Sequence, residues 1–157
     1  MQYQAARRLG GPELLSAEQR SALDTAFQIG FYEAVLRSEP EHLEALHALG
    51  HLYTAVGRHE DGLRIDEQLV RLTPQEPVVH YNLACSLALL GRTEQALQAL
   101  ARAIALGYRD ADHMIADPDL ASLRELDGFW TLYASIAEGD PAPEGERGRG
   151  AQGGALG

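Results

Sequence analysis

Residues 41–74 read EHLEALHALGHLYTAVGRHEDGLRIDEQLVRLTP, and residues 75–108 read QEPVVHYNLACSLALLGRTEQALQALARAIALGY. Shifting the chain by 34 residues aligns the two stretches, and a period of this length is typical of repeat architectures. The identical pairs at this offset are Pro40 with Pro74, Leu49 with Leu83, Gly57 with Gly91, Arg58 with Arg92, Glu60 with Glu94, Leu63 with Leu97 and Leu72 with Leu106. Their regular placement indicates two copies of one structural unit.

Each unit is predicted to be a pair of helices, because its apolar residues recur at helical spacing. In residues 41–74 the first stripe contains Leu43, Leu46, Leu49, Leu52, Tyr53 and Val56, and the second contains Leu63, Ile65, Leu69, Val70 and Leu72. Gly57 and Arg58 separate the stripes, and Pro74 follows the second. Glycine favours a helix end and proline prevents continuation, so two antiparallel helices joined by a tight turn are expected.

The motif Leu46-x2-Leu49-Gly50-x2-Tyr53 resembles the signature of the first helix of a tetratricopeptide repeat (TPR). Ala96-x3-Leu100 resembles the small-then-large pair of the second helix, and the small residues Gly50 and Ala84 would let paired helices approach closely. The resemblance implies an all-α fold, a right-handed solenoid of TPR helical hairpins, with clear repeats at 41–74 and 75–108.

Three residues depart from the TPR pattern. Gly62 replaces the usual alanine, Asp66 replaces the usual aromatic residue, and Tyr108 stands where a third proline would be. Burying an unpaired carboxylate is costly, so we expect Asp66 to point sideways and pair with an arginine or a tyrosine. Contact with a bound ligand is the alternative role for Asp66.

The segment before the repeats, residues 13–40, is interpreted as a degenerate first unit, preceded by a flexible N-terminus at 1–12. Ser16 and Gln19 have the spacing of a capping box, which predicts a long helix running to about Ser38. The expected core residues of this helix are Leu23, Phe27, Phe31, Val35 and Leu36.

The segment after the repeats, residues 109–138, resembles a C-terminal extension often seen closing bacterial TPR arrays. Asp117 followed by Pro118 predicts a helix start, and this capping role explains Asp117 and Asp119 more simply than a cation site does. A last helix at about 129–138 would cover the exposed end of the array, as solenoids require. Its contacting residues would be Phe129, Trp130, Leu132, Tyr133 and Ile136. Residues 139–157 are rich in glycine, proline and charge, and disorder is predicted for them.

Composition excludes several classes of function. The net charge is −10, from 23 acidic and 13 basic residues, and this field disfavours nucleic-acid binding. All the basic residues are arginine, so neither Schiff-base chemistry nor a P-loop lysine is available. No apolar run is long enough for a membrane span, and none follows the N-terminal arginines as it would in a secretory signal. The single cysteine allows no internal disulfide. We expect a cytoplasmic protein that binds no membrane.

Some individual residues could in principle bind a metal or react, but each has a simpler structural explanation. His47 and His51 lie four residues apart on one predicted helix face, but two ligands without a third make a poor metal site. His80 is expected to be a half-buried structural histidine, and Cys85 a small apolar filler without the positive surroundings of a reactive thiol. No cofactor, metal or catalytic residue is predicted.

The resemblance to TPR proteins also implies a concave binding surface formed mainly by the first helix of each unit. Its predicted residues are Glu44, His47, His51 and Thr54 in one unit and Val78, Tyr81, Asn82 and Cys85 in the next. Of these, the predicted peptide-binding residues are His47, His51, Tyr81, Asn82 and Cys85. Asn82 could hold a peptide backbone, since its amide both donates and accepts, or it could simply face water.

The carboxylate clamp of chaperone-binding TPR domains is not expected here. His47 and His51 replace the lysine and asparagine of that clamp, and the following segment offers Asp112 and Ala116 in place of cations. The leading hypothesis is a non-catalytic adaptor or scaffold that binds a neutral to basic protein segment. The alternatives are self-assembly, for example as a homodimer, and an enzyme or metal-binding accessory protein that uses His47, His51 and Asp66.

Overall fold

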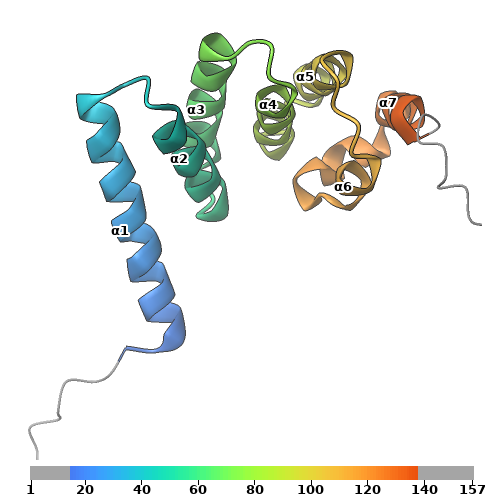
Figure 1. The fold of residues 1–157 in the computed structure, drawn as a ribbon. Helices are drawn as coiled ribbons and strands as arrows, with labels where there is room; N and C mark the ends of the chain where they lie inside the picture. The colour runs from blue at the N-terminus through green and yellow to red at the C-terminus, as the bar shows by residue number, and fades with distance from the viewer. Residues whose placement is uncertain (1–14, 138–157) are drawn as a thin grey trace, which may run out of the picture.

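The computed structural model describes residues 15–137, which form seven α-helices and one 3₁₀ helix, η1. In chain order these are α1 (Ala17–Ser38), α2 (Leu43–Ala55), α3 (His59–Leu72), α4 (Pro77–Leu89), α5 (Thr93–Ala105), α6 (Ala111–Ala116), η1 (Pro118–Glu125) and α7 (Asp127–Ala137). Each helix from α1 to α4 packs on the next, and the helices follow one another in an arc (Figure 1). The predicted all-α solenoid is confirmed. Among the described residues no helix is both long and apolar enough to cross a membrane.

The turns inside the repeats are built by glycine in a left-handed conformation. Gly57 and Gly91 follow α2 and α4 with φ angles of 76° and 71°. The N–H of Arg58 donates to the carbonyl of Tyr53 at 2.8 Å, and the N–H of Arg92 donates to that of Leu87 at 2.9 Å. These are Schellman turns, which satisfy the last carbonyls of a helix and reverse the chain. The glycine of the repeat is therefore required by backbone geometry.

Small residues allow the helices of the repeats to approach closely. Ala84 and Ala96 are fully buried between α4 and α5. A Cβ at Gly50 would lie 3.4 Å from Asp66 Oδ1 and from Ile65 Cγ2, so α2 and α3 are already in van der Waals contact there. The close approach predicted for Gly50 and Ala84 is confirmed.

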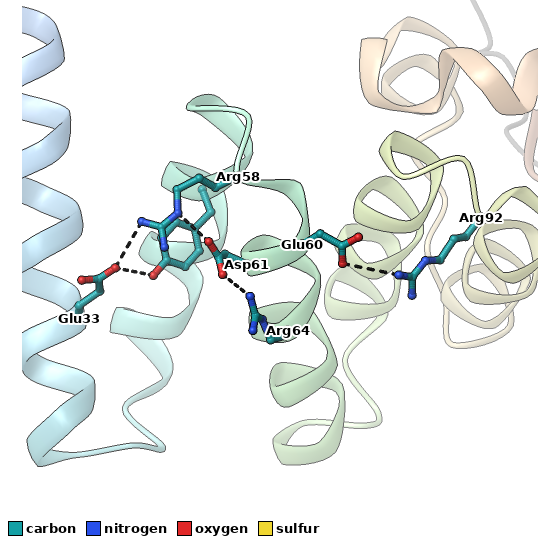
Figure 2. Close-up of polar contacts among 7 residues, drawn as sticks. Glu33, Arg58, Glu60, Asp61, Arg64 and Arg92 are labelled. Atoms are coloured by element: carbon teal, nitrogen blue, oxygen red, sulfur yellow. Dashed lines mark hydrogen bonds and ion pairs between the residues drawn. The ribbon is translucent and has the colours of Figure 1, made fainter.

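Ion pairs link successive units along one face of the arc (Figure 2). Arg58 and Arg92, which occupy the same position in their repeats, pair at 3.5 Å with Glu33 of α1 and Glu60 of α3, respectively. The Arg58 guanidinium also lies 4.2 Å from the centre of the Tyr53 ring, and the Tyr53 hydroxyl donates to Glu33 at 2.7 Å. Each turn arginine therefore contacts the unit before its own.

The predicted capping box of α1 is confirmed, since Ser16 Oγ accepts from the Gln19 N–H at 3.1 Å and the Gln19 side chain accepts from the Ser16 N–H at 2.8 Å. Residues 17–38 form one uninterrupted helix, so the degenerate first unit contains no helical hairpin in its described part.

The core predicted for α1 is partly wrong. Leu23, Phe27 and Phe31 are 56%, 75% and 55% exposed. The helix packs on α2 through Ile29 and neighbours on the same face, among them Tyr32 and Leu36, while Val35 is half-buried. The three exposed residues lie roughly half a helical turn away from Ile29, where no second helix covers them in the described part of the chain.

The C-terminal segment caps the solenoid as predicted. Asp117 accepts the Asp119 N–H at 3.0 Å and begins η1, so the predicted helix start is confirmed but the helix is of the 3₁₀ type. Helix α7 packs on α5, with Phe129 and Ile136 buried and Trp130 46% exposed.

Candidate functional site

A pocket of about 250 Å³ opens between α2, α4 and the α6–η1 segment. Helix α3 also contributes two side chains, both buried. The lining residues are His47, Gly50, His51, Thr54, Asp66, Leu69, Tyr81, Asn82, Cys85, Ser86, His113, Asp117 and Asp119. Two repeats and the capping segment thus form one continuous lining.

The structure brings the five predicted peptide-binding residues, His47, His51, Tyr81, Asn82 and Cys85, into this one lining. His51 is exposed and both His47 and Asn82 are half-buried, so these three side chains are available for contact. Tyr81 and Cys85 are only 4% and 9% exposed and form the wall of the pocket. Whether any of the five binds a peptide remains a prediction.

Two other residues predicted for the same surface, Glu44 and Val78, do not line the pocket. Both are exposed, and each lies three residues before a lining residue, His47 or Tyr81. Thr54, also predicted for this surface, is part of the lining.

Asp66 is the most deeply buried carboxylate of the pocket, with 6% of its surface exposed. The predicted arginine or tyrosine partner is wrong, because the Ser86 hydroxyl of α4 donates to Asp66 Oδ2 at 2.5 Å. Helix α3 packs directly on α4 and directs Asp66 toward that helix. Burial raises the pKa of Asp66 to about 6, although the Ser86 hydrogen bond works in the opposite direction.

Asp117 joins the capping segment to the wall of the pocket. In addition to its capping bond, it accepts the Tyr81 hydroxyl at 2.8 Å and lies 3.7 Å from the Cys85 sulfur, which donates its proton. The Tyr81 ring stacks on Tyr108, with 4.4 Å between ring centres. Burial first and the neighbouring carboxylate second raise the pKa of both Tyr81 and Cys85 far above their ordinary values, so both groups keep their protons at neutral pH.

Cys85 therefore does more than fill space. The prediction of a small buried residue is confirmed, but its thiol also donates to Asp117. His80, predicted to be a half-buried structural histidine, is buried instead, with 8% of its surface exposed, and its Nε2 lies 2.9 Å from the Pro74 carbonyl oxygen.

One group of residues in the pocket has the donor types of a metal site. Single ligand atoms of Cys85, Asp117 and Asp119 lie within 4.8 Å of one another, and His113 Nε2 is 3.6 Å from Asp117 Oδ2. However, Asp117 already accepts three hydrogen bonds, and the thiol holds its proton, whereas a metal binds the thiolate. A metal would have to displace these bonds, so the set fits a structural network better than a preformed metal site.

The sequence did not indicate that Ser86, His113 and Asp119 would share the pocket with the predicted residues. His113 and Asp119 belong to a segment outside the repeat period, so no repeat position predicts the direction of their side chains. Ser86 lies next to Cys85 in sequence, and nothing in the sequence indicated that its hydroxyl would face Asp66.

The fold and the pocket together define a helical-repeat protein with a short hollow surface. A family model described as a tetratricopeptide repeat matches residues 45–78. Two solved structures, each a crystal structure of MamA, are similar over most of the chain, with TM-scores of 0.61 and 0.60 at 26% and 27% identity. The alignments cover 81% and 78% of this chain, and 78% and 69% of the respective MamA chains. Residues 45–78 therefore match a tetratricopeptide repeat, and the described residues have the helical-repeat fold of the MamA structures.

Curated relatives match the chain over about half its length. A chloroplastic protein of Arabidopsis thaliana is 34% identical over 85 residues, which are 52% of this chain and 25% of that protein. A TPR repeat-containing protein of Treponema pallidum (strain Nichols) is 35% identical over 88 residues, which are 56% of this chain and 11% of that protein. The chain therefore spans a quarter or less of the length of these relatives.

Proposed function

We propose that this protein is a non-catalytic interaction module that binds a polypeptide segment across the pocket between α2, α4 and η1. TPR folds serve in protein–protein interaction, and the observation that carries the proposal is the common lining shared by His47, His51 and Asn82. An extended segment crossing these residues would meet an amide that can both donate to and accept from its backbone.

The charge of the pocket favours a neutral to basic segment. Asp66, Asp117 and Asp119 contribute carboxylates, and no arginine belongs to the lining. Complementary charge guides partner choice, and like charges facing each other disfavour a partner. A lysine or arginine side chain therefore suits this surface, whereas a C-terminal carboxylate does not. The sequence likewise predicts no carboxylate clamp.

A catalytic role finds less support, although the pocket does gather His47, His51 and Asp66. The side chains that could act as nucleophiles, Ser86 and Cys85, are buried and donate their protons to carboxylates. A thiol with a raised pKa is a weak nucleophile, because the thiolate is the reactive form. These contacts favour a structural role for both residues.

Selection of peptides from a random display library on the purified full-length protein tests the proposal. We expect enriched peptides to bind the native protein and to lose most of their affinity for the Asn82→Ala, His47→Ala double variant. Gln98→Ala, which shortens an exposed amide on α5, is the matched control and should bind normally. Unchanged binding to the double variant would show that the segment docks elsewhere.

The location of the protein is a separate part of the proposal. A cytoplasmic location follows from the sequence prediction, and cell fractionation with an antibody against the chain tests it. Recovery of the chain with membranes or secreted material would contradict this part and leave the binding proposal intact.

A further inference from the structure

Helix α1 carries a row of large apolar side chains that the solenoid does not use. Leu23, Phe27 and Phe31 are 56%, 75% and 55% exposed, and they lie four residues apart on one face. Exposed phenylalanines in a continuous row differ from the isolated apolar residues found on most protein surfaces. We call this row the α1 stripe.

The C-terminal half of α1 attaches the stripe to the solenoid. Figure 1 shows α1 at one end of the arc, and its principal contacts are with α2. Ile29 is buried against α2, and Glu33 accepts the Tyr53 hydroxyl and pairs with Arg58 (Figure 2). These contacts occupy one side of α1 and leave the stripe facing outward on the other.

The spacing of the stripe makes it complementary to itself. Leu23 and Phe31 are each four residues from Phe27, so a two-fold axis at Phe27 sets Leu23 of one protomer opposite the partner's Phe31 in an antiparallel pair. In a two-fold interface the same patch is used by both subunits, and this symmetry is what such an interface requires. The same pairing places Gly30, where an added Cβ would meet nothing within 4 Å, opposite the partner's Asp24.

Charge distinguishes the antiparallel pair from the parallel one. In the antiparallel pair Arg20 faces the partner's Ala34 and Asp24 faces the partner's Gly30, so like charges do not meet. A parallel two-fold pair would set Arg20 against the partner's Arg20 and Asp24 against the partner's Asp24, which costs free energy. We infer that the protein forms an antiparallel homodimer through α1, centred on Phe27.

The size of the stripe sets the strength of this dimer. Together the two phenylalanines expose roughly 200–300 Å² of side-chain surface to solvent, since a fully exposed aromatic side chain presents about 150–250 Å². A standard interface buries about 800 Å² on each partner. A single face of one helix about 33 Å long contributes less area than that. The dimer is therefore weak, with a dissociation constant on the order of micromolar.

Sedimentation of the full chain from low micromolar to near-millimolar concentration tests the inference. The expected result is a reversible shift from monomer to dimer that Phe27→Glu abolishes. Val78→Glu adds the same charge at another exposed apolar residue and should leave the dimer unchanged. A monomer throughout, as when another segment of the chain covers the stripe, would overturn the inference, and so would a dimer that survives Phe27→Glu.

Oxidative cross-linking tests the direction of the helices without altering Phe27. Leu23→Cys chains and Phe31→Cys chains, both also carrying Cys85→Ser, are mixed and oxidised, and the products are identified by mass. The antiparallel pair predicts mostly mixed disulfides, because identical positions lie about 12 Å apart along the axis, beyond disulfide reach. A predominance of disulfides between identical chains would contradict the antiparallel arrangement. Groove variants such as Asn82→Ala should affect neither experiment.

Discussion

At the scale of single residues, Asp66 gives the clearest energetic consequence. Its pKa is raised by burial from 3.8 to about 6, so between these values the folded protein holds a proton that the unfolded chain releases. Stability linked to this group is therefore greatest below pH 4 and falls as the pH rises through 6, by about 3 kcal/mol in total.

Replacing Asp66 with asparagine should remove that cost, because the amide oxygen can still accept the Ser86 hydroxyl. At pH 7.5 we expect Asp66→Asn to raise the free energy of unfolding by about 2–3 kcal/mol, and at pH 4 by much less. Denaturant unfolding of both proteins at the two pH values measures the difference. An equal effect at both pH values would mean that Asp66 ionises normally.

The sequence identified Asp66 as a misfit but did not identify its partner. A carboxylate in a normally apolar position signals that a partner is needed, whereas the partner depends on how α3 faces α4 across the repeat. Ser86 carries no such signal, since a serine fits equally well on a helix surface.

At the scale of elements, the turn glycines should tolerate no side chain. Gly91 has a φ of 71°, which costs an L-residue roughly 1–2 kcal/mol. We expect Gly91→Ala to lower the free energy of unfolding by about that amount, although an added Cβ would meet no atom within 4 Å. Denaturant unfolding checks the value. An unchanged stability would show that the Schellman turn is not required.

The glycine inside α3 should behave in the opposite way. An added Cβ at Gly62 would meet Thr54 Oγ1 at 3.5 Å and Ser86 Oγ at 3.7 Å, which are ordinary contacts. Alanine has less conformational freedom than glycine in the unfolded chain. Gly62→Ala should therefore raise the free energy of unfolding by about 0.5–1 kcal/mol in the same experiment. A loss of stability would indicate that the Asp66–Ser86 region cannot accommodate even a methyl group.

The elements with a periodic signal were the ones that could be predicted. Turn glycines and helical apolar spacing located α2 to α5, and Ser16 and Asp117 located two caps. The buried face of α1 could not be read in this way, because the helix carries apolar residues on two sides and only contact with α2 decides between them. Residues 1–12 and 139–157, predicted to be flexible and disordered, lie outside the described part of the chain.

At the scale of the whole molecule, the shared pocket predicts a preference for positive charge. Asp119→Asn should weaken binding of a selected basic peptide about two- to fivefold and leave a neutral peptide unaffected, since a partly exposed charge pair contributes about 0.5–1 kcal/mol. Isothermal titration calorimetry compares the two peptides. Glu94→Gln on α5 is the control for loss of one negative charge, and an equal loss in that variant would point to net charge alone.

The pocket itself was only half predictable. The resemblance to TPR units placed His47, His51 and Asn82 on one surface, because it implies a concave face formed by the first helix of each repeat. His113, Asp117 and Asp119 come from the capping segment, and their part in the pocket follows from how that segment packs on α4.

Binding of a polypeptide segment between α2, α4 and η1 can be followed residue by residue, through the amide chemical shifts of the protein during titration with a selected peptide. We predict that the largest shifts fall within residues 47–54, 81–86 and 113–119, the segments that contribute most of the pocket lining. Shifts confined to α1, or to the α3 and α5 residues outside the pocket, would contradict the proposed binding surface.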